Sequence, residues 1–468
     1  MKTPRRLLRM ILVAIVASVS LAAPAALAAA VKLPAVIGDH MVVQQGKPVA
    51  VWGWADKAEP VTVRFNGQEK RAVADAAGKW RVVFDPVKAG GAALEMTVAG
   101  ASGPVLVVKD ILAGEVWLAS GQSNMEWAMS WLPNPAPEVL RADHPGLRLF
   151  LVPKRTASEP REDVEAQWKV CAPDSVRPFS AVAYYFGLEL HKKLGVPVGM
   201  IASAWGGTLI EPWTPPAGYA AVPELMPILD KQLARKPDEN PWDSPQSPTA
   251  LYNGMIHALT PFAIRGAIWY QGESNRNDGL LYEKKMEALI RGWREVWKIG
   301  DLPFYYVQLA PYNYGYDRNM TSSPVLDDER LPLVWEAQRS ALRVPNTGMA
   351  VITDIADLAN IHPPNKVDVG RRLALWARAK VYGEKGLVFS GPLYKSMSVE
   401  GDKARIAFDH AGGGLIANDG QPLVWFEIAG EDRVFYRAEA AIDGDTVVVR
   451  SPRVAAPKAV RFGWHQLA

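Results

Sequence analysis

The sequence predicts an α/β protein in which helices cover a central parallel sheet and a small β module lies at each end. Short apolar runs alternate with helical stretches from about residue 111 to residue 381, a pattern typical of parallel sheets covered on both faces. Residues 31–108 and 388–468 instead alternate apolar and polar side chains in short segments separated by turns, which indicates antiparallel strands.

These patterns divide the chain into four parts. We expect a signal peptide at 1–29, an N-terminal β module at 30–108, an α/β domain at 109–387 and a C-terminal β module at 388–468. A chain of 468 residues is long enough for one large domain with smaller modules and a substantial core.

The first residues resemble a secretory signal. Basic residues precede the apolar stretch Met10–Val19, and Ala-Leu-Ala at 26–28 matches a small-residue cleavage site. We therefore expect a mature chain that starts near Ala29 or Ala30 and is exported to the periplasm or the medium. Pro24 interrupts an apolar segment already short for a span of about 20 residues, so no stable membrane anchor is expected.

The composition argues against a nucleic-acid-binding protein and is compatible with a protein that binds sugars. The net charge is only +3 and no run of Lys and Arg stands out, so a nucleic-acid partner is not expected. The chain has 17 Trp against 12 Phe. Tryptophan packs in cores and interfaces, and it also stacks on sugar rings. The single cysteine, Cys171, cannot form an intramolecular disulfide.

In the N-terminal module, strands are predicted on alternating patterns separated by the turn signals Asn66-Gly67 and Ala77-Gly78; they are 49–54, 61–65 and 80–84. In the α/β domain, buried apolar runs predict strands 116–119, 198–203, 266–270, 304–309 and 349–353. Helical spacing, with a Ser cap and a terminal Gly on the first helix, predicts helices 180–194, 280–297, 333–342 and 367–381. The many prolines of 211–250 predict a long loop. The C-terminal module should hold strands 404–408, 423–426, 446–449 and 460–464.

Polar clusters follow the predicted strands of the α/β domain. They occupy residues 121–125, 204–207, 271–275 and 360–363. Ligands of parallel sheets bind beyond the carboxyl ends of strands, so these clusters should converge at one edge.

The clusters contain the groups that acyl transfer requires, namely a nucleophile, a base and oxyanion donors. Ser123 lies in a turn between a strand and a helix, and His362 is the one His of seven at a strand end beside a polar loop. The amides near Ser123 and Gly206, together with the side-chain amide of Gln271, are candidate oxyanion donors.

Three motifs resemble a known family. Gly-Gln-Ser-Asn-Met at 121–125, Trp-Tyr-Gln-Gly-Glu-Ser-Asn at 269–275 and Ile-His-Pro at 361–363 are similar to those of the sialate O-acetylesterases, which are SGNH hydrolases related to other carbohydrate acetylesterases. The resemblance extends through both β modules. It implies an SGNH-like fold, removal of O-acetyl groups from a carbohydrate, Ser123 as nucleophile and His362 as base. It also implies that Ser123, Gly206 and Gln271 supply the oxyanion donors.

One position departs from that pattern. Many SGNH enzymes have an Asp three residues before the His, and here that residue is Ala359. We take Asp357 as the acid that orients His362 and Asp354 as its alternative. A backbone carbonyl near residues 359–360 would instead leave a Ser–His dyad. Glu273 is expected to neutralise a nearby cation or to buttress the Ser123 turn, without a catalytic role.

The expected partner is an acetylated glycan or sugar, and neither a metal nor a cofactor is expected, since the His residues lack ligand spacing and no HExxH is present. Two other classes remain open: a noncatalytic carbohydrate-binding or scaffold protein, and a glycoside hydrolase that pairs Glu273 with a second carboxylate. Sialic acid, xylan, xyloglucan and pectin all carry O-acetyl groups, and the residues do not choose among them.

Overall fold

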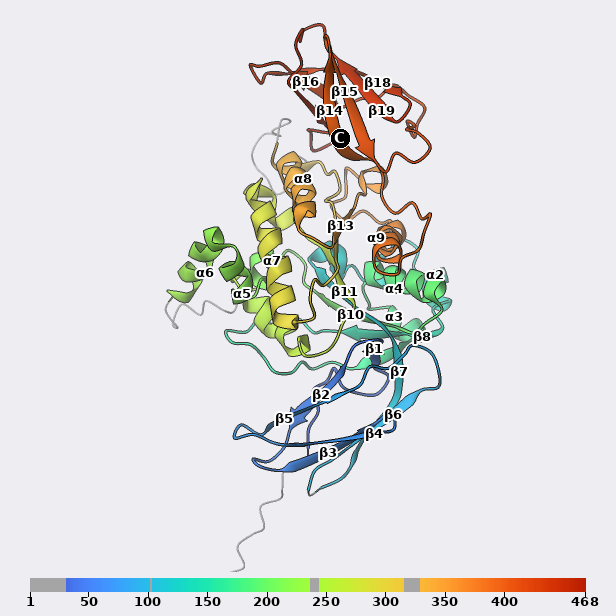
Figure 1. Cartoon of the computed structure of the whole chain (residues 1–468), viewed down its shortest axis with the longest axis vertical. Helices are drawn as coiled ribbons and strands as arrows, with labels where there is room; N and C mark the ends of the chain where they lie inside the picture. The colour runs from blue at the N-terminus through green and yellow to red at the C-terminus, as the bar shows by residue number, and fades with distance from the viewer. Residues whose placement is uncertain (1–30, 102, 236–243, 315–328) are drawn as a thin grey trace, which may run out of the picture.

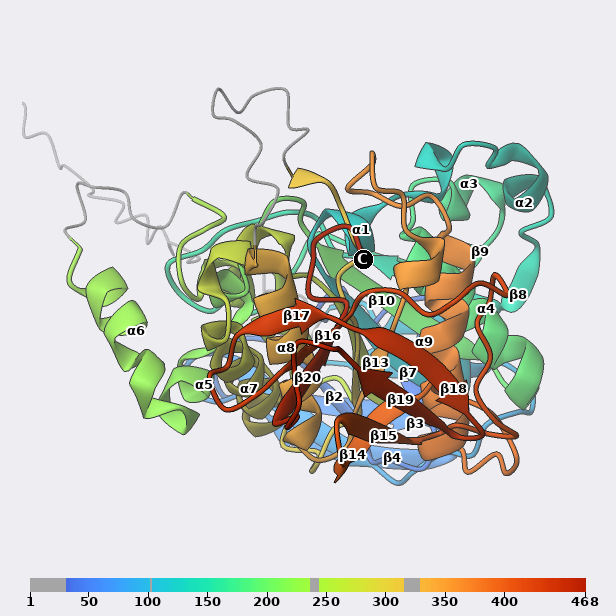
Figure 2. The same cartoon turned by 90° about the horizontal axis from the view of Figure 1, so that it is seen from above.

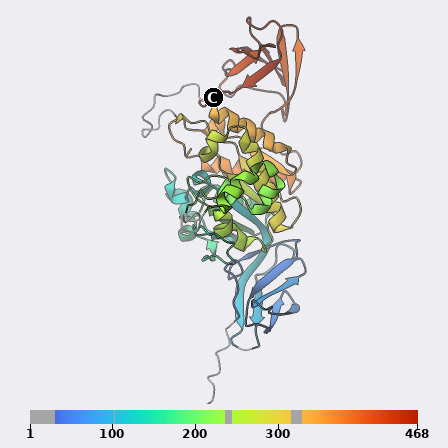
Figure 3. The same ribbon diagram turned by 90° about the vertical axis from the view of Figure 1, so that its left-hand side faces the viewer.

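The computed structural model describes residues 31–101, 103–235, 244–314 and 329–468, so the predicted signal peptide 1–29 lies outside the described residues. Three parts follow one another along the molecule (Figure 1). The N-terminal strands lie at one end, the helix-covered sheet in the middle and the C-terminal strands at the other end, as the side view confirms (Figure 3).

The central part is the predicted α/β layer. Its strands lie in the order β13-β12-β11-β7-β10-β8-β9, and all neighbours are parallel except β8 and β9. The strands are β7 (Leu106–Gly121), β8 (His144–Leu151), β9 (Trp168–Cys171), β10 (Val198–Ala204), β11 (Gly266–Tyr270), β12 (Phe304–Val307) and β13 (Thr347–Ala350). The α/β fold predicted from the sequence is therefore confirmed.

Strand β7 joins the N-terminal module to this sheet. Its first residues pair with β6 (Leu94–Ala99), and residues 117–121 lie between β10 and β11. Its burial changes from alternating to continuous at Ala113, as expected where a strand passes from a one-sided sheet to one covered on both faces. The strand crosses the boundary predicted between residues 108 and 109, so the two parts share one sheet.

Helices cover both faces of the sheet (Figure 2). Helices α4 (Ala181–Leu194) and α9 (Lys366–Lys380) pack together on one side, and α7 (Leu281–Trp297) and α8 (Arg330–Ser340) lie on the other. Helix α4 starts and ends as predicted, because Ser180 Oγ accepts a hydrogen bond from the Ala183 amide at 3.1 Å and Gly195 takes a φ of 66°. Short helices α1 (Ser123–Glu126), α2 (Ala136–Leu140) and α3 (Pro173–Val176) connect these layers.

The prediction of a long loop at 211–250 is wrong for part of this segment. Helices α5 (Pro216–Ala221) and α6 (Met226–Leu233) lie within it, and Tyr219 and Leu225 pack with Ala288 of α7. Pro216 and Pro227 lie in the first turns of these helices, where a fixed φ favours helix formation and no amide hydrogen bond is lost. Residues 236–243 of the predicted loop lie outside the described residues.

Both terminal modules are built mainly of antiparallel pairs, and β1 of the N-terminal module pairs with β7 in parallel. The N-terminal module contains β1 (Val42–Gln44), β2 (Val49–Trp54), β3 (Pro60–Phe65), β4 (Gln68–Val73), β5 (Lys79–Phe84) and β6. Its Asn66-Gly67 turn has positive φ at both residues, as predicted. The C-terminal module has a core of its own and contains β14 (Leu393–Glu400), β15 (Lys403–Asp409), β16 (Phe426–Ala429), β17 (Phe435–Arg437), β18 (Glu439–Asp443), β19 (Thr446–Arg450) and β20 (Ala459–Phe462).

Candidate active site

Ser123 is held in a tight turn at the carboxyl end of β7. Gly121, the last residue of the strand, has a φ of 143°, and a Cβ there would lie 2.1 Å from the Tyr270 carbonyl oxygen, so no other residue fits. Gln122 donates its amide to Tyr270 O at 3.0 Å, and its side-chain oxygen accepts the Gly272 amide at 3.2 Å. These contacts fix Ser123 as the first residue of α1.

His362 reaches Ser123 from the loop that follows β13. Its Nε2 lies 2.9 Å from Ser123 Oγ, and its amide donates to Asn360 Oδ1 at 2.9 Å. The imidazole stacks on Trp127, with ring centroids 4.7 Å apart and planes inclined by 28°. Ser123 and His362 lie far apart in the chain, and the prediction that they converge is confirmed by this contact.

Asn124 links the nucleophile turn to the His362 loop. Its Nδ2 donates to Glu273 Oε1 at 2.6 Å and to the Ile361 carbonyl at 3.0 Å, while its Oδ1 accepts from Lys366 Nζ at 2.5 Å. Ile361 immediately precedes His362. Asn124 therefore positions the imidazole through the backbone, and Glu273 buttresses the Ser123 turn as expected.

Burial shifts the ionisation of this cluster. Burial lowers the pKa of Lys366 to about 7, opposed by the negative charge of Glu273, and burial raises the pKa of Glu273 above its usual range. The pKa of His362 is lowered, first by burial and then by the positive charge of Lys366. A lowered pKa keeps the imidazole neutral near pH 7, as a general base requires.

Gly206 lies directly beside Ser123. A Cβ on Gly206 would lie 3.2 Å from the Ser123 Cβ, so the amide of Gly206 borders the nucleophile. That amide donates to Glu126 Oε2 at 2.5 Å, and the other Glu126 oxygen pairs with Lys154 at 2.5 Å. The Gly206 amide is therefore already hydrogen-bonded to a carboxylate of the protein. The Ser123 amide, at the start of α1, has no acceptor among the described residues.

Gln271 does not face Ser123 as an oxyanion donor. Its Nε2 donates to the Thr208 carbonyl at 3.1 Å and to Asn275 Oδ1 at 2.6 Å, and its Oε1 accepts from Tyr282 at 2.7 Å. Both amide protons are therefore used inside the protein. The oxyanion role predicted for Gln271 is corrected accordingly, because its position at a strand end does not reveal these buried partners.

Neither predicted acid contacts the imidazole. Asp354 forms a two-point ion pair with Arg372 of α9, with both N–O distances 2.6 Å, and this pair lowers the pKa of Asp354. Asp357 Oδ1 accepts the Ala359 amide at 3.0 Å and thereby caps a turn. In the described parts of the chain no carboxylate is hydrogen-bonded to His362, so the expected acid is corrected for both residues.

The roles of four site residues were not predicted from the sequence: Asn124, Glu126, Trp127 and Lys366. The first three lie within four residues of Ser123, and Asn124 stands in the 121–125 motif, so their closeness to the nucleophile was an available signal. No signal marked Lys366, because a Lys at a helix start normally lies in solvent, whereas here its side chain is buried.

Known proteins are similar to this chain in sequence and in fold. The solved structure of a carbohydrate acetylesterase from Xanthomonas citri is similar with a TM-score of 0.83 and 40% identity, over 93% of this chain and 94% of that one. The fold is thus that of the SGNH-like carbohydrate esterases, and the chain is a carboxylic-ester hydrolase. Residues 113–377 match the family model described as carbohydrate esterase, sialic acid-specific acetylesterase.

Two curated relatives agree. The sialate O-acetylesterase of Homo sapiens is 35% identical over 398 residues, which cover 76% of this chain and 72% of the relative. That of Mus musculus is 33% identical over 418 residues, covering 78% and 76%. The chain belongs to the sialate O-acetylesterase family, and the resemblance inferred from its motifs is confirmed.

Proposed function

We propose that this chain removes O-acetyl groups from a carbohydrate by forming an acyl-enzyme on Ser123, with His362 as the general base. The observation that carries the proposal is the 2.9 Å contact between Ser123 Oγ and His362 Nε2. Both residues belong to motifs that resemble those of the family, and they meet at the carboxyl end of the parallel strands. The names of the relatives support an acetylated sugar as substrate.

The proposed reaction has two steps. His362 takes the Ser123 proton while Oγ attacks the acetyl carbonyl, and the imidazolium then protonates the departing sugar oxygen. In the second step His362 takes a proton from water, which attacks the acetyl-enzyme, and returns it to Ser123 Oγ as acetate leaves. The Ser123 and Gly206 amides bind the oxyanion, and the carbonyl oxygen displaces the Glu126 carboxylate from the Gly206 amide to do so.

The arrangement supports a Ser–His dyad, one of the possibilities open from the sequence. Stacking on Trp127 and the Asn124 contact to the Ile361 carbonyl hold the imidazole in place of an acid. The glycoside-hydrolase reading is less well supported, because Glu273 Oε1 is bonded to Asn124 and its Oε2 is buried.

Product analysis tests the function. The purified protein is incubated with acetylated sialosides, xylan, xyloglucan and pectin, and acetate and reducing ends are both measured. We expect acetate from at least one substrate without new reducing ends. Reducing ends would establish a glycoside hydrolase, and a protein that binds the glycans and releases neither product would be a noncatalytic binding protein.

The two acids provide a test of the dyad. We expect Asp357→Asn and Asp354→Asn each to lower kcat for acetate release by about tenfold or less, because neither carboxylate contacts His362. Loss of a true triad acid costs about four orders of magnitude. Steady-state kinetics measure the loss of kcat. A thousandfold loss in either variant, with a native circular dichroism spectrum, would show that its carboxylate is the third member of a triad.

The pH profile tests the electrostatics of His362. The base must be neutral, so kcat/KM should fall as the pH drops through the folded-state pKa of His362, which lies below its ordinary value of about 6.5. Lys366→Met removes the positive charge that lowers this pKa, so the acid limb should move to higher pH. Lys380→Met, at the exposed end of the same helix, should leave the limb in place. A folded Lys366→Met variant with an unmoved limb would contradict this assignment.

We also propose that the protein is exported after cleavage of residues 1–29. The basic start, apolar stretch and Ala-Leu-Ala site support this, and within the part of the chain that the structure describes no helix is long and apolar enough to span a membrane. Intact mass of protein from the periplasm or medium should show a chain that begins near Ala29 or Ala30. Recovery of the full-length chain from the membrane fraction would disprove it.

A further inference from the structure

The outer face of the β2–β5 pair carries two tryptophans beside two cations. Trp52 and Trp54 alternate with Gly53 and so lie on one face of β2, opposite the buried Val51. In the antiparallel register Trp52 lies across from Arg81 and Trp54 across from Lys79. The indole N–H groups of both tryptophans have no acceptor among the described residues, so each ring offers a free donor beside its apolar surface. Lys32 Nζ lies 5.3 Å from the ring centre of Trp54 and adds a further cation at this face.

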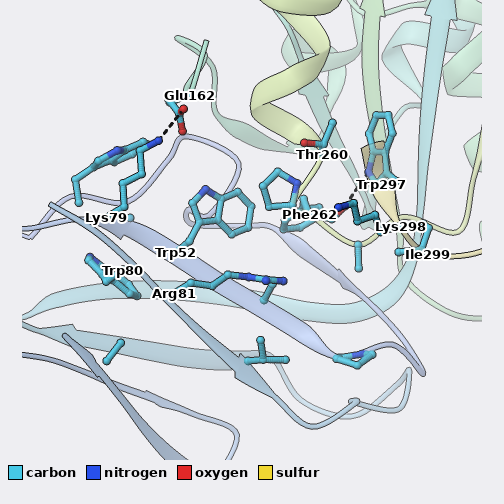
Figure 4. Close-up of a pocket in the computed structure, with 18 of the residues that line it drawn as sticks. Trp52, Lys79, Trp80, Arg81, Glu162, Thr260, Phe262, Trp297, Lys298 and Ile299 are labelled. Carbon is cyan, nitrogen blue, oxygen red and sulfur yellow. Dashed lines mark hydrogen bonds and ion pairs between the residues drawn. The ribbon is translucent and has the colours of Figure 1, made fainter. Parts of the chain in front are cut away.

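This face forms one wall of a large cavity. The cavity has a volume of about 960 Å³, within the range of ligand sites. Figure 4 shows Trp52 and Arg81 on this wall, with Phe262 and Trp297 of the α/β domain across from them. Trp297 Nε1 donates to the Phe262 carbonyl at 3.2 Å, so the facing wall is braced.

Two smaller cavities continue it into a groove. The second cavity, of about 710 Å³, has Trp54 and Glu162 in its lining, as the first cavity does. The third cavity, of about 240 Å³, has Lys47 and Ile299 in common with the first. We name these three cavities the module groove. Its length along the junction of module and domain suits an extended chain better than a single small molecule.

The first and largest of the three cavities has an excess of positive charge, with four basic residues against Asp75 and Glu162. Lys79 pairs with Glu162 at 2.9 Å, and Asp75 Oδ1 accepts the Ala77 and Lys79 amides. The remaining cations of the first cavity have no ion pair in the described ranges; they are Lys47, Arg81 and Lys298. Unpaired cations next to exposed indoles fit a ligand that has both carboxylates and apolar ring faces.

The module groove is separate from Ser123. Residues 260–263 and the end of α7 lead into the amino ends of β11 and β12, whereas Ser123 follows the carboxyl end of β7. These strands are parallel, so groove and nucleophile lie at opposite edges of the sheet. A ligand in the groove therefore does not contact the reacting atoms.

We propose that the module groove is a noncatalytic binding site for an acidic glycan, whose sugar rings stack on Trp52 and Trp54 while its carboxylates pair with Arg81, Lys47 and Lys298. The proposal rests on the proposed function in so far as a carbohydrate is the substrate. Such a site keeps the enzyme on an acidic polymer and raises the local concentration of acetyl groups.

Affinity electrophoresis of the full mature chain through gels with polygalacturonate or unsubstituted xylan tests the proposal, and neither probe has acetyl groups to hydrolyse. Wild type should be retarded by polygalacturonate and much less by xylan. Trp52→Ala and Arg81→Gln should each weaken binding by about tenfold, and Arg81→Gln should reduce its salt dependence. Trp425→Ala, which changes an exposed Trp of the C-terminal module, should bind as wild type.

Hydrolysis of a small acetyl ester is measured in parallel, and all three variants should retain wild-type kcat. Absence of retardation, equal retardation by xylan, or unchanged binding in both groove variants would overturn the proposal. If polygalacturonate binds through Trp52 and Arg81 but no acetate is released from any substrate, the groove stands and the esterase proposal fails.

Discussion

Ser123→Ala is expected to abolish acetate release, with a loss of at least about a thousandfold in kcat, because among the residues that the structure describes no other hydroxyl is hydrogen-bonded to His362. Removal of the serine from a serine hydrolase costs up to about six orders of magnitude. The remaining activity would come from the oxyanion donors and from substrate binding alone. Acetate release at saturating substrate measures the loss.

The fold should tolerate this change. Ser123 is a small side chain at the start of a short helix, so the free energy of unfolding should change by no more than about 1 kcal/mol. Chemical denaturation serves as the control. A folded Ser123→Ala variant with near wild-type turnover would rule out the serine as the nucleophile.

Asn124→Ala is expected to damage both stability and activity. The change removes the hydrogen bonds of Asn124 to two buried charged groups, the Glu273 carboxylate and the Lys366 ammonium, and unfolding should become easier by about 3 kcal/mol. It also removes the contact to Ile361 O, so the His362 loop loses its tie to the nucleophile turn. Misplacing a catalytic group by about 1 Å costs about a hundredfold in rate, and we expect a loss of that order in kcat.

Asn253→Ala is the matched control. Asn253 is also buried, and its amide donates to the Ala157 and Ser158 carbonyls at 3.2 and 3.0 Å, with no contact to Ser123 or His362. It should lose stability yet retain wild-type kcat. Equal kcat in the two variants would show that Asn124 has only a structural role.

Ser123 and His362 were predictable because the sheet determines where they lie. Buried strands are recognisable as short apolar runs, and the carboxyl ends of parallel strands share an edge, so polar residues just after strands must converge. The same reasoning failed for Gln271, whose direction depends on Thr208, Asn275 and Tyr282. Thr208 is 63 residues away in the chain, and the two nearer partners face Gln271 only through the way the 271–282 segment folds, which the strand and helix patterns do not show.

The prediction of an acid that orients His362 was wrong for a related reason. Asp354 lies near His362 in the chain, yet Arg372 on the facing helix α9 provides a stronger two-point partner. Asp357 satisfies the amide of a nearby turn residue, as Asp often does in loops. The strand and helix patterns of the sequence predict neither contact, because both depend on how the 353–365 loop folds against α9.

The central claim is that Ser123 carries the acetyl group during turnover. Rapid acid quench of the enzyme with an acetylated substrate, followed by mass spectrometry of its peptides, tests this directly. We predict one acetyl group on Ser123 of the wild-type enzyme during turnover at saturating substrate, and none in Ser123→Ala. Acetate release with no acetyl-enzyme trapped in either protein, or an acetyl group that forms on another residue at the rate of turnover, would contradict the account.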